Sequence, residues 1–303
     1  MSGYEARSFV IGDVHGCLLE LRQLVRKIQF RPRQDRLIFV GDLVGRGPFP
    51  LETLEYVRDL GSMGINIMGN HDLALLARGT YEVDRQVKAV VPSGHRATDT
   101  ARRWSAVLDW LGRSPFIYND APQKVVVSHA GIPPQFAIDT AIDVARGLER
   151  KLRKSARHVA RSIDRSLSGR FETDDTTSAS EKHIGVGCTR IRYCRTDGSM
   201  AGPERELSAK AAQHLVPWSS LRNHASDNGR TIVHGHWAAL GIHMTNNALC
   251  IDDGCVFGGR LVAVELSPGL PITWIRGRRY FNLRDFREKW KGEEHDLKIC
   301  MPS

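Results

Sequence analysis

Short apolar runs alternate with amphipathic stretches along the first half of the chain. The apolar runs predict strands over residues 8–13, 36–42, 65–69 and 124–130. The amphipathic stretches, in which apolar side chains recur three and four positions apart, predict helices over residues 17–30, 51–60 and most of 73–111. Strands that alternate with helices are typical of βαβ units, so we expect a largely parallel sheet.

The second half of the chain follows a different pattern. Residues 137–168 are predicted to form one long helix with an apolar and a basic side, and the polar stretch 170–182 to form a mobile loop. Short runs between glycine-rich turns predict a second, mixed sheet, with strands over residues 231–235, 248–252, 261–266 and 272–275. We expect one α/β domain over residues 1–275, with the helix and loop at 146–185 as an insertion, and a peripheral charged segment, 276–303.

The composition is that of a folded globular protein, with 41% hydrophobic and 25% charged residues in a chain of 303. The sequence has no run of about 18 apolar residues that could span a membrane, and Met1–Arg7 does not resemble a secretion signal. We therefore expect a cytoplasmic protein with no membrane partner. The six cysteines form no C-x-x-C pair and are expected to be reduced thiols.

The net charge of +9 is concentrated in one segment. Nine positive and two negative residues lie between Arg146 and Arg170, which leaves the rest of the chain close to neutral. A basic helix face of this kind is often only solvated. It could also attract a polyphosphate substrate or the 5′ end of an RNA, and both interpretations stay open.

Side chains that can bind metal ions follow five of the predicted strands. They lie in the segments GDVHG (12–16), GDLVGRG (41–47), GNHD (69–72), SHA (128–130) and HGH (234–236). Ligands of parallel α/β sheets bind beyond the carboxyl ends of the strands, so we expect these segments to converge at one edge. Each segment alone could be a helix-capping turn or contain a buried histidine, but five of them in order favour one site.

The mixture of carboxylate, imidazole and amide groups indicates the kind of metal. Such a set suits Mn, Fe, Co or Zn, whereas cysteine-rich sets select Zn and all-oxygen sets select Mg or Ca. One carboxylate can bridge two ions, which lowers the pKa of a shared water and positions it for attack on phosphorus. The residues therefore indicate hydrolysis of a phosphate ester or anhydride with two metal ions.

The five motifs resemble those of the metallophosphoesterase superfamily, in the branch that includes the protein serine/threonine phosphatases. Within this branch the chain is most similar to the bacterial symmetrical dinucleoside tetraphosphatases, which hydrolyse diadenosine tetraphosphate. The closer similarity lies in GDLVGRGP (41–48), GNHDLALLA (69–77), SHAGIPP (128–134), TRIRYC (189–194), HGHWAALG (234–241) and IDDGCVFGG (251–259). It implies an α/β/β/α sandwich of two mixed sheets flanked by helices.

The resemblance also implies a role for each motif residue. The implied metal ligands are Asp13 and His15 for one ion, Asp42 as the bridge, and Asn70, His129 and His236 for the other ion. Arg46 would hold phosphate, and His71 would protonate the leaving oxygen as general acid. The two divalent ions are expected to be Mn or Co, with Fe, Zn or Mg as alternatives.

One position departs from the protein phosphatases. In those enzymes the residue before the motif arginine is an aspartate that orients the catalytic histidine, whereas this chain has Gly45. The dinucleotide hydrolases also have a small residue there, so the departure argues against a protein phosphatase. Asp72 or Asp252 could orient His71 instead, and Asp252 could alternatively hold the ring of a ligand histidine.

Residues outside the metal motifs are candidates for substrate binding. Arg190 and Arg192 would share one face if TRIRYC is a strand and could clamp a polyphosphate chain, with a solvated surface pair as the alternative. The candidates for stacking on a purine base are Tyr193, Trp218, Trp237 and Phe257, although core packing is the commoner role of such rings. We place Trp237 first, because it directly follows a metal ligand.

We therefore expect a bimetal hydrolase that cleaves diadenosine tetraphosphate symmetrically into two ADP, through attack of a metal-activated hydroxide on an inner phosphorus. The first alternative is a phosphatase of the same fold that acts on phosphoprotein or on 5′-capped RNA. A non-catalytic nucleic-acid-binding protein is a remote alternative, because a binding module does not need six metal ligands. The sequence leaves the oligomeric state open.

Overall fold

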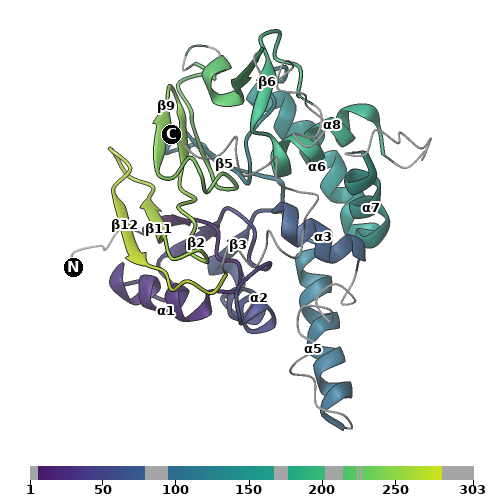
Figure 1. Ribbon diagram of the computed structural model, residues 1–303, viewed down its shortest axis with the longest axis vertical. Coiled ribbons are helices and arrows are strands. Elements are labelled where there is room, and N and C mark those ends of the chain that lie inside the picture. The colour runs from purple at the N-terminus through teal and green to yellow at the C-terminus, as the bar shows by residue number, and fades with distance from the viewer. Residues whose placement is uncertain are drawn as a thin grey trace.

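In the computed structural model, two five-stranded mixed sheets face each other and helices cover their outer sides (Figure 1). The structure describes residues 6–78, 95–166, 177–201, 214–223, 225 and 227–281, with side chains in the helix at 95–111 from Asp99 onward. Apolar side chains from both sheets form the layer between them, among them Val10, Ile38, Val127 and Val233. The expected two-sheet architecture is confirmed.

The first sheet has the strand order β12-β11-β1-β2-β3. Its strands are β1 (Ser8–Ile11), β2 (Arg36–Phe39), β3 (Gly64–Asn66), β11 (Arg260–Glu265) and β12 (Ile272–Arg276). The first three are parallel, as predicted, whereas β11 runs antiparallel to β1 and pairs Val264 with Val10. The assignment of 261–266 and 272–275 to the second sheet is therefore wrong, because β11 is buried along its centre and pairs with the open edge of β1.

The second sheet has the strand order β4-β5-β8-β10-β9. Its strands are β4 (Ile117–Asp120), β5 (Val125–Ser128), β8 (Thr231–His234), β9 (His243–Thr245) and β10 (Ala248–Cys250). β5, β8 and β10 are parallel to one another, and antiparallel β4 and β9 form the two edges. The edge strands were not predicted, since each is short and carries polar or exposed residues. A separate hairpin pairs β6 (Tyr193–Arg195) with β7 (Leu215–Pro217).

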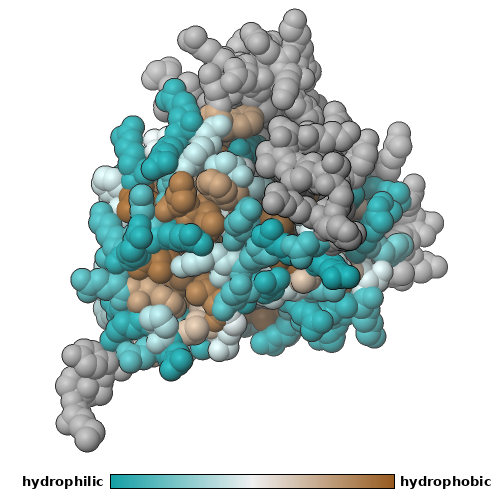
Figure 2. Space-filling model, turned by 90° about the horizontal axis from the view of Figure 1, so that it is seen from below, coloured by the Kyte–Doolittle hydropathy of each residue, from teal (hydrophilic) through white to brown (hydrophobic). Residues whose placement is uncertain are grey.

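The helices pack in two groups (Figure 1). Their bounds are α1 (Leu18–Lys27), α2 (Pro50–Asp59), α3 (Asn70–Arg78), α5 (His95–Leu111), α6 (Ile138–Lys154), α7 (Ala156–Ser166) and α8 (Ala179–Arg190), with 3₁₀ turns at Gly61–Met63 and Trp218–Leu221. α1 packs on β11 and β12, and α2 packs on β3, whereas α6, α7 and α8 pack on one another. Figure 2, a view from below, shows a mostly hydrophilic face with apolar residues visible between the polar side chains. None of the helices in the described ranges is long and apolar enough to cross a membrane.

Two helical features differ from the sequence prediction. The predicted helix over 137–168 is interrupted at Ser155, whose extended backbone (φ −151°) separates α6 from α7. The predicted loop 170–182 contains the start of α8, where Ser178 and Glu181 form a reciprocal capping box. The spacing Ser-x-x-Glu is a known signal for a helix start, and it could have revealed this helix. Residues 167–176 lie outside the described ranges.

The segment after β12 packs back onto the domain over its first residues. The hydroxyl of Tyr280 donates a 3.0 Å hydrogen bond to Oε1 of Glu20 on α1, and its backbone N–H donates to the carbonyl of Val256. Phe257 and Phe281 make an edge-to-face contact with ring centroids 5.9 Å apart. Residues 282–303 lie outside the described ranges.

Candidate active site

The candidate ligands follow the carboxyl ends of β1, β2, β3, β5 and β8, and all lie in loops except Asn70, which begins α3. β1, β2 and β3 run parallel to one another in the first sheet, as β5 and β8 do in the second, and their carboxyl ends bring these segments together. The side chains of Asp13, His15, Asp42 and His129 are all buried. Ligands from both sheets thus form one cluster.

Asp42 lies between two groups of potential ligands. Its Oδ2 is 3.7 Å from Nε2 of His15, and its Oδ1 is 3.6 Å from Nε2 of His129. Asp42 groups with His15 and His71 on one side, and with Asp13 and His129 on the other, with the ligand atoms of each group within 4.8 Å of one another. A carboxylate in this position can contribute one oxygen to each of two ions.

Asn70 joins the His129 side of the cluster. Its Oδ1 is 3.0 Å from Nε2 of His129 and 3.0 Å from Nδ1 of His236. Asp13 links the two sides, because its Oδ2 is 3.9 Å from Nε2 of His15 while its carboxylate also accepts the backbone N–H of His236. The six residues implied as metal ligands are therefore assembled around Asp42.

Backbone carbonyls orient two of the imidazole rings. Nδ1 of His15 lies 3.0 Å from the carbonyl oxygen of Val44, and Nδ1 of His129 lies 3.0 Å from that of Val40. A hydrogen bond from Nδ1–H leaves the lone pair on Nε2, the atom that faces Asp42 in both residues. This is the arrangement that metal-binding histidines commonly show.

Three of these residues have a left-handed backbone. His15, Asp42 and His236 have φ values of 48°, 51° and 67°. Non-glycine residues rarely adopt this conformation, and it is concentrated at functional sites, where the surrounding structure holds it. In these three residues it occurs at sharp turns after β1, β2 and β8, and these turns direct the side chains into the cluster.

Burial raises the pKa of each clustered carboxyl group. It raises the pKa of Asp13 well above its usual value, and Asp252 and Asp42 add to the effect through like-charge repulsion. Burial raises the pKa of Asp42 and Asp72 to about 7 and that of Asp252 to about 6. Carboxylates crowded in this way are stabilised by a bound cation, so the cluster fits a divalent metal.

The imidazole groups are in the state that metal binding requires. Burial lowers the pKa of His15 and of His129 to about 3, so both rings are neutral. Nε2 of His236 is buried and has no hydrogen-bond partner among the described residues. A neutral nitrogen ligand without a partner is consistent with a metal site.

Three arginines place positive charge near this cluster. Arg46 lies in the loop between β2 and α2, Arg190 ends α8, and Arg192 donates a 3.3 Å hydrogen bond to the carbonyl of His236. Burial raises the pKa of Asp42, and all three arginines oppose that rise. The condition under which Arg190 and Arg192 would share a strand face is not met, because α8 continues through Arg190. Its guanidinium pairs with Asp164 at 2.9 Å, an aspartate that sequence spacing did not single out.

Neither Asp72 nor Asp252 is hydrogen bonded to the ring of His71 among the described residues. Asp72 accepts hydrogen bonds of 3.4 Å from the backbone N–H groups of Val44 and Gly69, so it links the loop after β2 to the loop after β3. Asp252 accepts a 3.0 Å bond from the N–H of Gly254. The ring of His71 contacts that of His15 edge to face, with centroids 4.9 Å apart.

Gly45 has no room for a side chain. A Cβ atom there would lie 2.5 Å from Nδ1 of His15 and 3.1 Å from Nδ1 of His71, and the φ of +149° is also unfavourable for other residues. The aspartate that protein phosphatases carry at this place would therefore displace His15. This geometry explains the departure found in the sequence.

The candidate aromatic residues occupy different surroundings. Tyr193 is half-buried and contacts the buried Trp237 edge to face, with centroids 5.0 Å apart. Trp218 is fully buried against His234, so it belongs to the core. Phe257 lies with Phe281 beneath the guanidinium of Arg46, which is 5.5 Å and 5.8 Å from the two ring centroids. Phe281 was missed, since it lies far outside the motifs.

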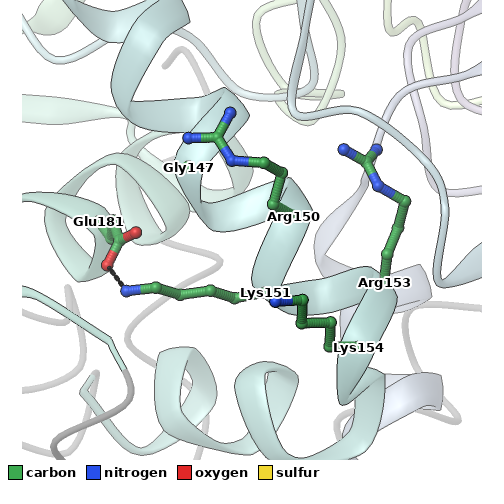
Figure 3. Close-up of a pocket in the computed structure, with 6 residues that line it drawn as sticks. All are labelled: Gly147, Arg150, Lys151, Arg153, Lys154 and Glu181. Atoms are coloured by element: carbon green, nitrogen blue, oxygen red, sulfur yellow. Dashed lines mark hydrogen bonds and ion pairs between the residues drawn. The ribbon is translucent and has the colours of Figure 1, made fainter.

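The basic side of α6 surrounds a surface hollow of about 470 Å³. Figure 3 shows Arg150, Lys151, Arg153 and Lys154 extending from the helix around it, with Lys151 paired to Glu181 of α8. That ion pair is 2.6 Å long. Among the described residues, Arg150, Arg153 and Lys154 form no ion pair, so the hollow is strongly positive.

Curated relatives cover almost the whole chain. A symmetrical bis(5′-nucleosyl)-tetraphosphatase of Thioalkalivibrio sulfidiphilus is 35% identical over 86% of this chain and 94% of its own length. Proteins of the same name from Methylococcus capsulatus and Klebsiella pneumoniae are 35% and 34% identical, over 86% and 93% of this chain and 91% and 96% of their own lengths.

Solved structures share the fold. A crystal structure of a protein provisionally named a diadenosine tetraphosphatase matches with a TM-score of 0.58 at 23% identity, over 92% of this chain and 97% of that one. A protein serine/threonine phosphatase from Saccharomyces cerevisiae matches with a TM-score of 0.54 at 15% identity, over 92% and 82% of the two chains. The model of the calcineurin-like phosphoesterases matches residues 6–253, so the chain belongs to this family of metallophosphoesterases.

Proposed function

We propose that this protein hydrolyses diadenosine tetraphosphate symmetrically to two ADP. The observation that carries the proposal is the position of Asp42 between two groups of buried ligands, with His15 on one side and His129 on the other. The names of the relatives support the substrate, since they are symmetrical bis(5′-nucleosyl)-tetraphosphatases that align over more than nine-tenths of their length.

The cluster is suited to two divalent ions. The residues that would hold them are Asp13 and His15 on one side, Asn70, His129 and His236 on the other, and Asp42 between the two. Bound ions would activate a water molecule and neutralise phosphate oxygens. Mn or Co best suits the mixture of oxygen and imidazole ligands, and Fe, Zn or Mg are alternatives.

Arginine side chains on both sides of the cluster would bind the phosphates. A guanidinium group donates two parallel hydrogen bonds to phosphate oxygens, and both Arg46 and Arg192 lie beside ligand residues. Arg190 is tied to Asp164, so it would contribute mainly a fixed positive field. This arrangement would hold a tetraphosphate with an inner phosphorus near Asp42.

His71 is our candidate for the general acid that protonates the leaving oxygen. Burial and then Arg46 hold its pKa well below the usual value, so the ring is neutral in the absence of substrate. Phosphates bound at Arg46 would offset that charge and favour the protonated ring. Asp72 would act on catalysis through Val44 and Gly69, by holding the two loops that carry the site, and Asp252 would act through its negative charge.

The basic hollow supports a second substrate class, RNA with a capped 5′ end. α8 leads from Glu181 at the hollow to Arg190 near Asp42, roughly 14 Å along the helix axis. An RNA whose 5′ phosphates lie at the metals could therefore extend its backbone toward Arg150 and Arg153. A phosphoprotein substrate has less support, because Gly45 leaves no space for the aspartate of that branch.

One incubation tests the proposed function. Metal-stripped protein is supplied with Mn or Co and diadenosine tetraphosphate, and the products are separated by ion exchange. ADP as the sole nucleotide product is expected. AMP plus ATP would contradict symmetrical attack, and no turnover, alongside activity on capped RNA or phosphopeptide, would reject the proposed substrate.

A further inference from the structure

Two aromatic pairs lie next to the phosphate-binding arginines. Phe257 and Phe281 lie beneath the guanidinium of Arg46. Tyr193 and Trp237 directly follow Arg192 and His236 in the chain, and their rings contact each other edge to face, with centroids 5.0 Å apart. Phe257, Phe281 and Tyr193 are all half-buried, so each residue is partly exposed to solvent.

The two pairs are on different sides of Asp42. A Cβ atom on Gly45, the residue before Arg46, would lie 2.5 Å from Nδ1 of His15. Arg192 instead donates a hydrogen bond to the carbonyl of His236, whose ring lies against the same Oδ1 of Asn70 as the ring of His129. The Arg46 side is therefore the His15 side, and the Arg192 side is the His129 side.

A symmetrical cleavage places a demand on the binding site. The scissile bond is at the middle of diadenosine tetraphosphate, so the two nucleosides must extend in opposite directions from the metals. Two base platforms at matching distances on opposite sides of the ligand cluster would hold the middle bond at that cluster. On each side of the ligand cluster the protein has an arginine and then a pair of aromatic rings. This order matches the substrate, in which phosphates and then a base lie on each side of the scissile bond.

We infer that Phe257 with Phe281 and Tyr193 with Trp237 are the two adenine platforms, and that their positions on either side of Asp42 direct hydrolysis to the middle of the tetraphosphate. This inference rests on the proposed function. Each base would stack on or against a half-buried ring, which is the common way in which proteins bind nucleobases without reading them. Trp237, being buried, would support Tyr193 rather than contact the base.

The test compares a substrate that has bases with an inhibitor that has none. KM is measured for diadenosine tetraphosphate, and the inhibition constant is measured for inorganic tetraphosphate, in the variants Tyr193→Ala and Phe257→Ala. Each variant is expected to raise KM about 10-fold, and the double variant about 100-fold, with the inhibition constant of tetraphosphate unchanged. Tyr193→Phe keeps the ring and is expected to retain the KM of the wild type.

Trp274→Leu is the matched control, because Trp274 is an exposed aromatic residue on β12 that also lies against cationic side chains, Lys27 and Arg260. It is expected to leave both constants unchanged. An unchanged KM in Tyr193→Ala and Phe257→Ala would overturn the inference. The inference would also be overturned if KM for the substrate and the inhibition constant of tetraphosphate rose by the same factor, because the rings would then only hold the arginines in place. Both outcomes presuppose that the wild type releases ADP, so failure of the proposed function is seen separately, in the wild-type assay.

Discussion

The backbone N–H of His71 donates a 2.8 Å hydrogen bond to Oδ1 of Asp42. This bond joins the first turn of α3 to the loop after β2. The same carboxylate therefore faces His15, faces His129 and holds the backbone of the candidate general acid. Replacing Asp42 should affect both metal binding and the position of His71.

Asp42→Asn is expected to reduce kcat about 10²–10³-fold, because it removes the charge between the two ligand groups while keeping the size of the side chain. The wild type should gain thermal stability when Mn is added to the metal-stripped protein, and the variant should not. Calorimetry with and without Mn, together with steady-state kinetics, checks both points. Asp253→Asn, at the ion pair with Arg260, is the control. Full turnover in Asp42→Asn would contradict the role of the carboxylate.

Gly45→Ala is expected to lower kcat at least about 10-fold, because the new Cβ atom would displace His15 or His71. Gly61→Ala is the matched comparison. Gly61 also has a positive φ, +60°, but a Cβ atom there meets nothing within 4 Å. The Gly61→Ala substitution should lower the free energy of unfolding by about 1 kcal/mol, through the backbone conformation alone, and leave kcat unchanged. Equal kcat values in the two variants would show that the space around Gly45 is not needed.

Reversing the charges of Arg150, Arg153 and Lys154 to glutamate is expected to weaken binding of capped RNA and to spare diadenosine tetraphosphate. Log affinity falls as log salt concentration rises, and loss of three phosphate contacts should make this slope less negative by about 2 for a single strand. Arg161 is left unchanged, because its Nε donates to the carbonyl of Ala77 and fixes α7 to α3. Titrations of labelled RNA at several salt concentrations provide the measurement.

The control for that experiment reverses three other exposed arginines, Arg26, Arg33 and Arg102, which are not part of the hollow. The net charge then changes by the same amount. A similar loss of RNA affinity in both triple variants would mean that total charge matters and the hollow does not.

Asp35→Asn is expected to destabilise the fold in a pH-dependent way. The Asp35 carboxyl is fully buried, which raises its pKa, but hydrogen bonds from Arg31 and Arg7 outweigh burial and hold the pKa below the usual value. The carboxylate thus stabilises the fold above its unfolded pKa of about 3.9, and the contribution disappears as the pH falls below that value. We expect a loss of about 1–3 kcal/mol at pH 7 that becomes smaller below pH 4.

Urea unfolding at pH 7 and at pH 3.5 measures the effect. Asp59→Asn is the control, because the side chain of Asp59 is 64% exposed beside Arg58 and its removal should matter little at either pH. If the free energy of unfolding differed between wild type and Asp35→Asn by the same amount at both pH values, the lowered pKa of Asp35 would be contradicted.

The elements that the sequence predicts well are those whose signal is local. β1, β2 and α1 are each marked by an uninterrupted apolar run or stripe, and the loops after the two strands carry Asp13 and Asp42. Because the carboxyl ends of parallel strands coincide, the alternation of elements also predicted that these side chains meet. The motif resemblance supplied the grouping of the histidines around them.

Other features depend on pairings between distant parts of the chain. The antiparallel partner of β1 comes from residues 260–265, and no local pattern tells a strand which edge it will join. The sequence left open whether TRIRYC is a strand, and in the structure α8, which packs against α6 and α7, continues through Arg190. The contact of Phe281 with Arg46 likewise follows from tertiary packing.

The pairing of β11 with β1 has a consequence for synthesis. On the ribosome, the segment with Asp13 emerges early, but the backbone N–H that its carboxylate accepts belongs to His236, and the strand that covers β1 follows later still. Long-range contacts of this kind form late in folding. Catalytic capacity should therefore be acquired only after residues 236–265 have emerged, and a nascent chain stopped before these segments would hold its first metal ligands without a working enzyme around them.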